Sequence, residues 1–182
     1  MKITKVHPAE RPAFQARLAA LERLATYPLG DDTFQLDHGP DYFAFFDRLG
    51  ELLYGVALED DLVAAVGCGV LRRVVVRQGQ RPRRTWYLGD LKVHPDFRGR
   101  RLPLRLLGRH FWWNYARAPR GYGFTMDAPG GEAGVARLFG HWRWSPIVMA
   151  GSLGIWSLDA DQARRARPLV ERHRGPVRLR SL

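Results

Sequence analysis

Cysteine is almost absent from this chain of 182 residues, in which Cys68 is the only one. A single thiol cannot form an internal disulfide, so the sequence argues against a disulfide-stabilised secreted domain and predicts a reducing, cytoplasmic setting. His94 and His110 have no partners at the spacing of metal ligands, and the sequence holds no cysteine–histidine cluster. No metal site is therefore expected.

Long apolar runs are also lacking. No stretch of about 18 apolar residues occurs, so neither a membrane-spanning helix nor a membrane partner is expected. Residues 1–5 lack the apolar run of a secretory signal, and the chain has no low-complexity block or internal repeat. With 46% hydrophobic and 12% aromatic residues, the composition is that of a packed globular domain.

Lysine is scarce, yet the formal net charge is +11 because arginine supplies nearly all of the basic residues. The arginines are spread along the chain and do not gather in one arm, which argues against a nucleic-acid partner. A phosphate-rich cofactor or an acidic carrier protein would suit this charge equally well.

The N-terminal part predicts a strand followed by two helices. Residues 2–6 alternate weakly, as a strand does. The first helix has an apolar face at spacings of three and four residues, formed by Phe14, Leu18, Leu21 and Ala25. Residues 27–40 are expected to form a loop. Asp41 is expected to cap a short aromatic-rich helix that ends at Gly50.

The remaining elements predict a mixed sheet. Strands are expected at 52–58, 62–77, 85–93 and 121–126, helices at 103–117, 132–140 and around 160–172, and a closing hairpin at 144–150 and 154–158. The first three strands form an antiparallel meander, and the strand–helix–strand order from 85 to 126 implies one parallel crossover. We expect one domain over residues 1–158, with 159–182 as a basic extension packed on it.

The segment from Leu91 to Leu104 carries the clearest chemical signal. A strand ends at Val93, a tight turn follows, and a basic loop around Gly99 opens a helix. The first amides of a helix lack internal partners and lie at the positive end of its dipole. Successive loop amides form an anion nest, to which arginine adds charge-assisted bonds. The segment therefore predicts a pyrophosphate site.

This segment resembles the signature of the GCN5-related N-acetyltransferase (GNAT) superfamily, which is Q/R-x-x-G-x-G/A after a strand. Arg98 stands at the Q/R position. The sequence departs from the signature at two positions, because Arg101 replaces the usual glycine and Pro103 replaces the final glycine or alanine. Proline offers no amide to a phosphate, and the Arg101 side chain can replace that contact.

The resemblance implies an α/β fold with a mixed, mostly antiparallel central sheet flanked by helices. Strand 85–93 is expected to carry a bulge and to splay from strand 122–127, and the splayed pair forms the cleft for acetyl-CoA or another acyl-CoA. Pantetheine would pair with the backbone near Leu91 and Val93. The expected CoA-binding residues are Leu91, Lys92, Val93, Arg98, Gly99, Arg100, Arg101, Leu102 and Leu104.

The implied reaction transfers an acyl group from CoA to a small-molecule or peptide amine, which must lose a proton. Tyr87 lies where related enzymes place a glutamate or histidine, and Asp90 is the carboxylate inside the same strand. Both are candidate catalytic residues, and the bulge leaves open which of them faces the cleft. Asp127 and Tyr42 are the candidate acceptor-binding residues.

Two other functions are compatible with these residues. The same fold could take its acyl group from an acidic acyl-carrier protein, which the basic surface and the departures at Arg101 and Pro103 would suit. A CoA-sensing or nucleic-acid-binding module without catalysis is the other alternative. It rests on residues 132–139, which look like a degenerate family motif with Phe139 in place of the tyrosine that often serves as general acid. A homodimer also remains open.

Overall fold

The computed structural model describes residues 1–29, 32–75, 81–114, 116–125 and 159–173. The chain divides into two compact units, Met1–Ser145 and Pro146–Leu182. The described strands all lie in the first unit, and the described part of the second is one helix. The domain boundary, the helix at 132–140 and the closing hairpin expected from the sequence fall outside the described residues.

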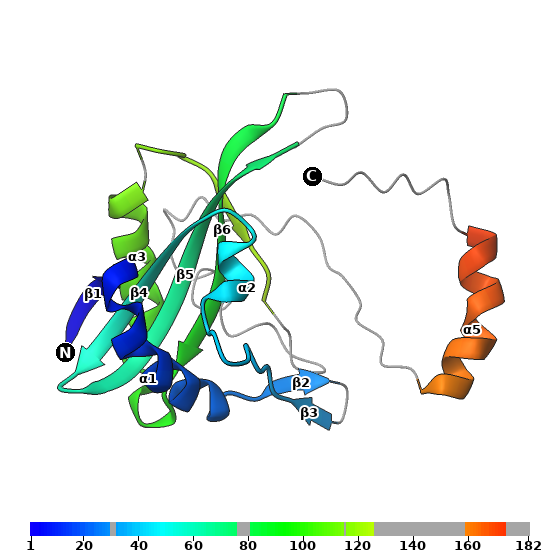
Figure 1. Ribbon diagram of the computed structural model, residues 1–182, viewed down its shortest axis with the longest axis horizontal. Coiled ribbons are helices and arrows are strands. Elements are labelled where there is room, and N and C mark those ends of the chain that lie inside the picture. Colours follow the sequence, from blue (N-terminus) through cyan, green and yellow to red (C-terminus); the bar gives the residue numbers. More distant parts are fainter. Residues whose placement is uncertain (30–31, 76–80, 115, 126–158, 174–182) are drawn as a thin grey trace. The chain divides into compact units, whose positions relative to one another are not determined.

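Five strands form the main sheet in the order β1-β4-β5-β6-β7 (Figure 1). They are β1 (Lys2–Val6), β4 (Glu51–Glu59), β5 (Leu62–Val74), β6 (Arg83–Val93) and β7 (Gly121–Gly123). The first four are antiparallel neighbours, whereas β7 lies parallel to β6 after a crossover through α3 (Leu102–Asn114). The mixed sheet, the meander and the parallel crossover are confirmed.

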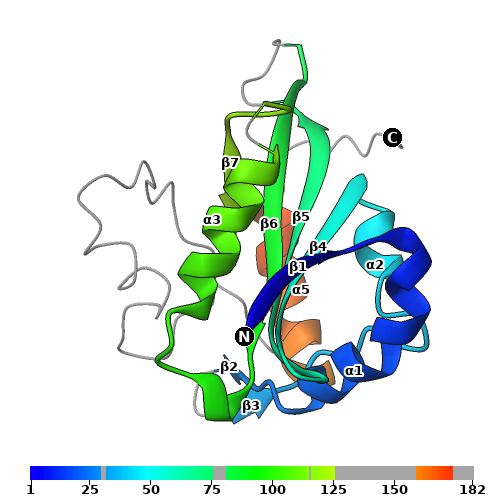
Figure 2. The same ribbon diagram turned by 90° about the vertical axis from the view of Figure 1, so that its left-hand side faces the viewer.

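Helices cover both faces of this sheet (Figure 2). On one face lie α1 (Arg11–Arg23), preceded by the short 3-10 helix η1 (Pro8–Glu10), and α2 (Ala44–Asp47). The predicted face of α1 is buried there, with Leu18 packed in one cluster with Tyr54 and Val66 of the sheet. On the other face, α3 buries Leu102 and Leu106 against sheet alanines. The sheet therefore has one aromatic-rich side and one side that supports α3.

The loop prediction for residues 27–40 is wrong in part. A small separate hairpin forms there, from β2 (Tyr27–Leu29) and β3 (Asp32–Phe34). Tyr27 pairs with Phe34 across the ladder, and the two ring centroids lie 5.5 Å apart. Cross-strand aromatic pairs stabilise such ladders. Pro28, which favours a loop, lies within β2, opposite Thr33.

The turn into β4 depends on Gly50. Its φ of 154° is rarely adopted by other residues, and a Cβ at this position would lie 2.5 Å from the carbonyl oxygen of Leu71. The predicted helix stop at Gly50 is confirmed, since α2 ends at Asp47 and β4 starts at Glu51. Asp41 does accept a hydrogen bond from the amide of Phe43, although α2 begins at Ala44.

Gly50→Ala is expected to lower the free energy of unfolding by about 1–3 kcal/mol, because the methyl group meets backbone and the dihedral is strained. Urea denaturation measures the change. Gly39→Ala is the matched control, since Gly39 also has a positive φ of 76° but open space around its Cβ position. Equal losses in the two variants would show that the contact with Leu71 is unimportant.

The second unit contributes α5 (Ala160–His173), which confirms the helix predicted around 160–172. Asp159 begins it, because its carboxylate accepts hydrogen bonds from the amides of Asp161 and Gln162 at 2.9 and 2.7 Å. A side-chain oxygen at this position commonly accepts hydrogen bonds from the free amides at the start of a helix. Packing of this helix on the first unit stays a prediction.

Candidate functional site

A β-bulge interrupts β6 at Asp90. In the ladder with β5, Val66 faces Lys92 and Cys68 faces Gly89, so that Gly67 alone lies opposite Asp90 and Leu91. Asp90 has a φ of 53°, which is costly for a residue with a side chain and is tolerated best by asparagine and aspartate after glycine. The bulge expected in strand 85–93 is confirmed.

Beyond the bulge, β6 runs without β7. The parallel ladder joins Trp86, Tyr87 and Leu88 to Gly121, Tyr122 and Gly123, and β6 then continues to Val93. Among the described residues, the β7 side of Gly89–Val93 has no strand partner. This is the splayed strand pair that the sequence predicted. It leaves backbone groups of Leu91 and Val93 at an open edge, where an extended ligand can pair with them.

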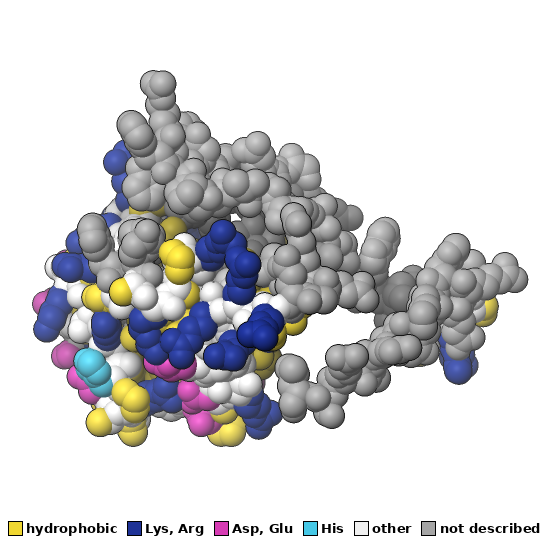
Figure 3. Space-filling model, turned by 90° about the horizontal axis from the view of Figure 1, so that it is seen from above, with side chains coloured by type: hydrophobic (Ala, Val, Ile, Leu, Met, Phe, Trp, Pro, Cys, Tyr) yellow, Lys and Arg dark blue, Asp and Glu magenta, His cyan; other side chains and the backbone are white. Residues whose placement is uncertain are grey.

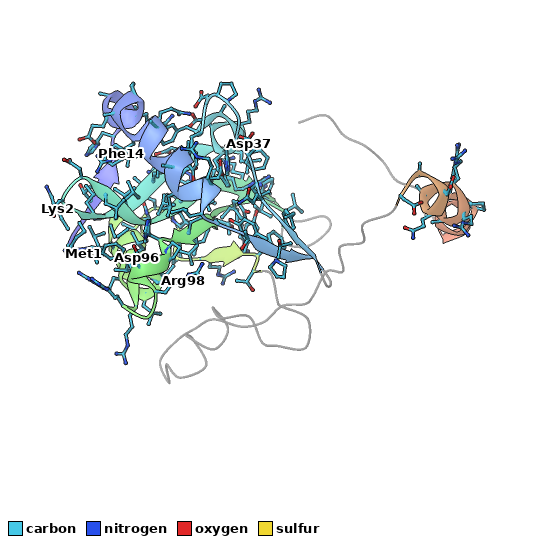
Figure 4. All side chains as sticks on the ribbon, turned by 90° about the horizontal axis from the view of Figure 1, so that it is seen from below. Met1, Lys2, Phe14, Asp37, Asp96 and Arg98 are labelled. Carbon is cyan, nitrogen blue, oxygen red and sulfur yellow. The ribbon has the colours of Figure 1, made fainter. Side chains whose placement is uncertain are left out.

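The loop between β6 and α3 is exposed from Arg98 to Arg101. After the 3-10 helix η2 (Pro95–Phe97), Arg98 is extended, and Gly99 and Arg101 have positive φ values of 79° and 55°. A Cβ at Gly99 would meet nothing within 4 Å. Figure 4 shows Asp96 and Arg98 on this loop. The exposed turn, followed at once by a helix N-terminus, fits a diphosphate.

Apolar contacts fix this loop on the sheet. Phe97 and Leu102 are buried against the face that α3 covers, and the amide of His94 donates to the carbonyl oxygen of Ala64 at 2.9 Å. The Arg100 guanidinium lies 4.6 Å from the centre of the Phe97 ring. Leu102 can therefore offer a ligand its backbone but not its side chain. Leu104 is half-buried.

A buried ionic cluster supports the bulge from the α1 side, and we call it the Lys92 cluster. It consists of Glu22, His38, Tyr42, Asp90 and Lys92. The Lys92 ammonium forms an ion pair with Asp90, lies 3.4 Å from a carboxylate oxygen of Glu22, and donates to the hydroxyl of Tyr42 at 3.0 Å. Tyr42 in turn donates to Asp90 at 2.8 Å. The side chains of Lys92 and Asp90 are each 1% exposed.

Two members of the cluster come from segments to which the sequence assigned no function. Glu22 lies on α1 and pairs with the His38 ring, and it also accepts a hydrogen bond from the His38 amide at 3.1 Å. The second ring nitrogen of His38 lies 4.0 Å from Asp90. The cluster thus ties the segment before α2 to the bulge of β6. A glutamate within the apolar face of α1 was the signal that could have indicated a buried partner.

Charge and burial act together on the titrating groups of this cluster. Burial alone would lower the pKa of Lys92, but the carboxylate of Asp90 and its hydrogen bond outweigh that effect, and the pKa is raised. Burial, followed by the negative charge of Asp90, raises the pKa of the Tyr42 hydroxyl far above the ordinary phenol value. Lys92 is therefore charged and Tyr42 neutral at physiological pH.

Comparison with known proteins identifies the fold. The chain is similar to a predicted acetyltransferase of Clostridium acetobutylicum with acetyl-CoA, at 12% identity and a TM-score of 0.54 over 84% of this chain and 95% of the other. A protein of Bacillus halodurans matches at 12% identity and a TM-score of 0.58, over 87% and 99%. The chain has the GNAT fold. Neither a family model nor a curated protein matches its sequence.

A third structure with this fold is an aminoglycoside acetyltransferase from an uncultured soil metagenomic sample. It shares 15% identity and a TM-score of 0.55, over 85% of this chain and 98% of the other. The structures are thus alike along most of their length while their side chains differ. Within the GNAT fold, the residues of this chain must be judged on their own geometry.

Tyr87 is the predicted catalytic residue that lies at the splay itself. It faces Tyr122 in the β6–β7 ladder, one pair before the ladder ends, with ring centroids 5.4 Å apart, and it stacks on Phe46 of α2 at 6.3 Å. Burial is the largest of the effects that raise the pKa of its hydroxyl. A half-buried tyrosine of this kind keeps its proton at neutral pH and is suited to donate a hydrogen bond.

The other predicted site residues divide into three groups. Arg98, Arg100 and Arg101 are exposed on the loop, as a phosphate site requires. Lys92, Asp90 and Tyr42 bind one another in the interior, so their direct contact with a ligand stays a prediction. Asp127 and the motif at 132–139 lie outside the described residues.

The described residues form neither a metal-binding cluster nor a membrane-spanning helix. No group of three or more histidine, cysteine, aspartate or glutamate side chains in that part of the chain is arranged to hold a metal ion. None of the described helices has the length and apolarity needed to cross a membrane.

Proposed function

We propose that this chain is an N-acyltransferase that moves an acetyl or other acyl group from CoA to a small-molecule or peptide amine. One observation carries the proposal. The strand that is bulged at Asp90 and splayed from β7 leads directly into a basic loop at the start of α3. A ligand that carries both a thioester and a diphosphate needs a site for each. The open edge of β6 would hold the thioester end, and the basic loop that follows it in the chain would hold the diphosphate. The related structure with acetyl-CoA supports the choice of ligand.

The proposed CoA site has two parts. The amides around Gly99 and at the start of α3, with Arg98, Arg100 and Arg101, would bind the phosphates. The free edge of Leu91–Val93 would pair with pantetheine. Lys92 itself adds nothing to this edge, because its ammonium is buried in the Lys92 cluster and its backbone, like that of His94 two residues on, is turned to β5. Pro103 costs little, since the second residue of a helix has no internal partner for an amide.

The proposed reaction is direct attack of a neutral amine on the thioester carbonyl. The nitrogen–carbon bond forms, the carbon–sulfur bond breaks, the amine loses a proton to water, and CoA leaves as the thiol. A backbone amide at the bulge would stabilise the oxyanion. We assign to the Tyr87 hydroxyl the role of giving its proton to the leaving sulfur, and water then returns a proton to Tyr87. Asp90, held by Lys92 and Tyr42, is better suited to position the bulge than to accept the proton.

A thiol-release screen of acetyl-CoA against a panel of amines tests the proposal. We expect release above background with at least one amine, together with a rise in Tm on adding CoA. Two further measurements distinguish this proposal from a carrier-protein-dependent enzyme and from a nucleic-acid-binding module. Turnover restricted to an acylated carrier protein would identify a different donor. Strong, salt-sensitive DNA binding with no thiol release and no response to CoA would overturn the proposal.

Arg98→Ala is expected to weaken CoA binding about tenfold, because a charge-assisted bond to phosphate is lost. Isothermal titration of CoA measures the loss, which should shrink as salt rises. Arg23→Ala, at an exposed position on α1, is the control and should bind CoA as the parent does. Equal affinity in Arg98→Ala and in the parent would remove Arg98 from the phosphate site.

A further inference from the structure

Arginine residues gather at the end of the sheet where β5 ends and β6 begins, which is the end of β6 opposite its loop to α3. We call this surface the arginine end, and it consists of Arg72, Arg73, Arg83, Arg84, Arg117 and Arg120. Figure 3 shows basic side chains gathered on the upper face of the molecule. Since the CoA phosphates would bind at the opposite end of β6, this charge is not explained by the donor.

The acidic side chains near the arginine end are already paired. Glu51 binds Arg117, and this hydrogen bond is the main cause that holds the pKa of the Glu51 carboxyl below its ordinary value. Asp47 of α2 binds Arg11 at 2.6 Å. Arg73 and Arg84 face each other across the ladder, an arrangement of like charges that destabilises a sheet. Glu51 is close enough to Arg84 for that charge to contribute to its lowered pKa, but its hydrogen bond goes to Arg117.

Arg72 connects the arginine end with the predicted catalytic residue Tyr87. It faces Thr85 in the ladder, and Val70 faces Tyr87, so Arg72 and Tyr87 are diagonal neighbours on the same face of the sheet. The Nε atom of Arg72 is shielded from solvent and has no hydrogen-bond partner in the part of the chain that the structure describes. A ligand would therefore meet the terminal nitrogens of the guanidinium, whose charge lies close enough to Tyr87 to act against the rise that burial causes in the pKa of that hydroxyl.

We propose that the acceptor amine carries an anionic group, a carboxylate or a phosphate, and that Arg72 binds it. This inference rests on the proposed function and names the class of its acceptor. Along this face of the sheet, Arg72 is followed by Val70 and Tyr87 and then by the bulge, so an acceptor that approaches from the arginine end would pass Arg72. The guanidinium binds carboxylate and phosphate in a planar, two-point geometry, which fixes the amine relative to its anion. The arginine end would repel polycationic amines.

Matched acceptors test the proposal. Ethanolamine phosphate is compared with ethanolamine, and β-alanine with its amide, in the thiol-release assay with acetyl-CoA. The anionic member of at least one pair should have a kcat/KM at least about tenfold higher, and the pair concerned tells phosphate from carboxylate. An aminoglycoside should be the poorest acceptor. Equal or higher kcat/KM for the neutral or polycationic acceptors would overturn the inference and leave the acyltransferase proposal intact.

Variants at Arg72 test the residue itself. Arg72→Gln should bring the ratio between anionic and neutral acceptors close to one, whereas Arg72→Lys should keep part of it. Arg109→Gln, at an exposed position on α3, is the control and should keep the parental ratio. An unchanged ratio in Arg72→Gln would overturn the assignment. If the parent releases no thiol with any amine, the proposed function itself has failed.

Discussion

Replacing Lys92 with methionine is expected to lower the free energy of unfolding by about 3–5 kcal/mol. The side chain is 1% exposed, and its ammonium lies between the carboxylates of Asp90 and Glu22. Methionine has a similar shape, so the loss would come from two buried carboxylates left without their cation rather than from a cavity. Urea denaturation followed by circular dichroism measures the effect.

Three comparisons make this result specific. Lys2→Met, at an exposed position of β1, should change stability by less than about 0.5 kcal/mol. The double variant Lys92→Met with Asp90→Asn should recover part of the loss, because one unpaired carboxylate is removed. Because the pKa of Lys92 is raised, its contribution is complete below the unfolded value near pH 10.4 and is lost only above it. A gap between parent and variant that closes as the pH rises from about 6 to 9 would contradict this account.

Replacing Asp90 with asparagine is expected to reduce kcat about 100-fold while the Kd for CoA changes less than about threefold. Asparagine tolerates the positive φ of this position, so the chain can still form the bulge. What it lacks is the charge that holds Lys92, so the backbone amides at the bulge lose their fixed direction. The measurements are steady-state kinetics with acetyl-CoA and isothermal titration of CoA.

The pH profile separates positioning from proton transfer. If Asp90 positions the bulge, Asp90→Asn should lower kcat at every pH and leave the shape of the profile unchanged. Loss of the acidic limb would instead identify Asp90 as the general base. Asp61→Asn, at an exposed position in the turn between β4 and β5, is the control for a lost carboxylate. A parental kcat in Asp90→Asn would show that the Lys92 cluster does not act on catalysis.

Much of the fold follows from local patterns in the chain. The alternating residues of β4, the valine- and glycine-rich run of β5 and the charged residues 59–61 between them predict a hairpin, because these signals lie within neighbouring residues. The spacing of Phe14, Leu18 and Leu21 predicts the buried face of α1 for the same reason. The loop around Gly99 was found because a strand end, a basic turn and a helix start are contiguous in the sequence.

The Lys92 cluster could not be predicted because its members come from distant segments. Glu22 and Lys92 meet only after β6 has paired with β5 and α1 has packed on the sheet. Each has a polar side chain at a position where the pattern calls for an apolar one. A polar residue at an apolar position indicates that it has a buried partner, but the sequence does not show which residue that partner is. The hairpin at Tyr27 and Phe34 was missed because its stability depends on one cross-strand ring pair.

The most direct test of the central claim is the mass of the acceptor itself. An accepted amine is incubated with acetyl-CoA and the protein, and the acetylated amine and the free CoA thiol are measured together. The account predicts equal amounts of the two, formed in proportion to the amount of protein, and reduced in Asp90→Asn. CoA thiol released without any acetylated amine would show hydrolysis instead of transfer and would contradict it.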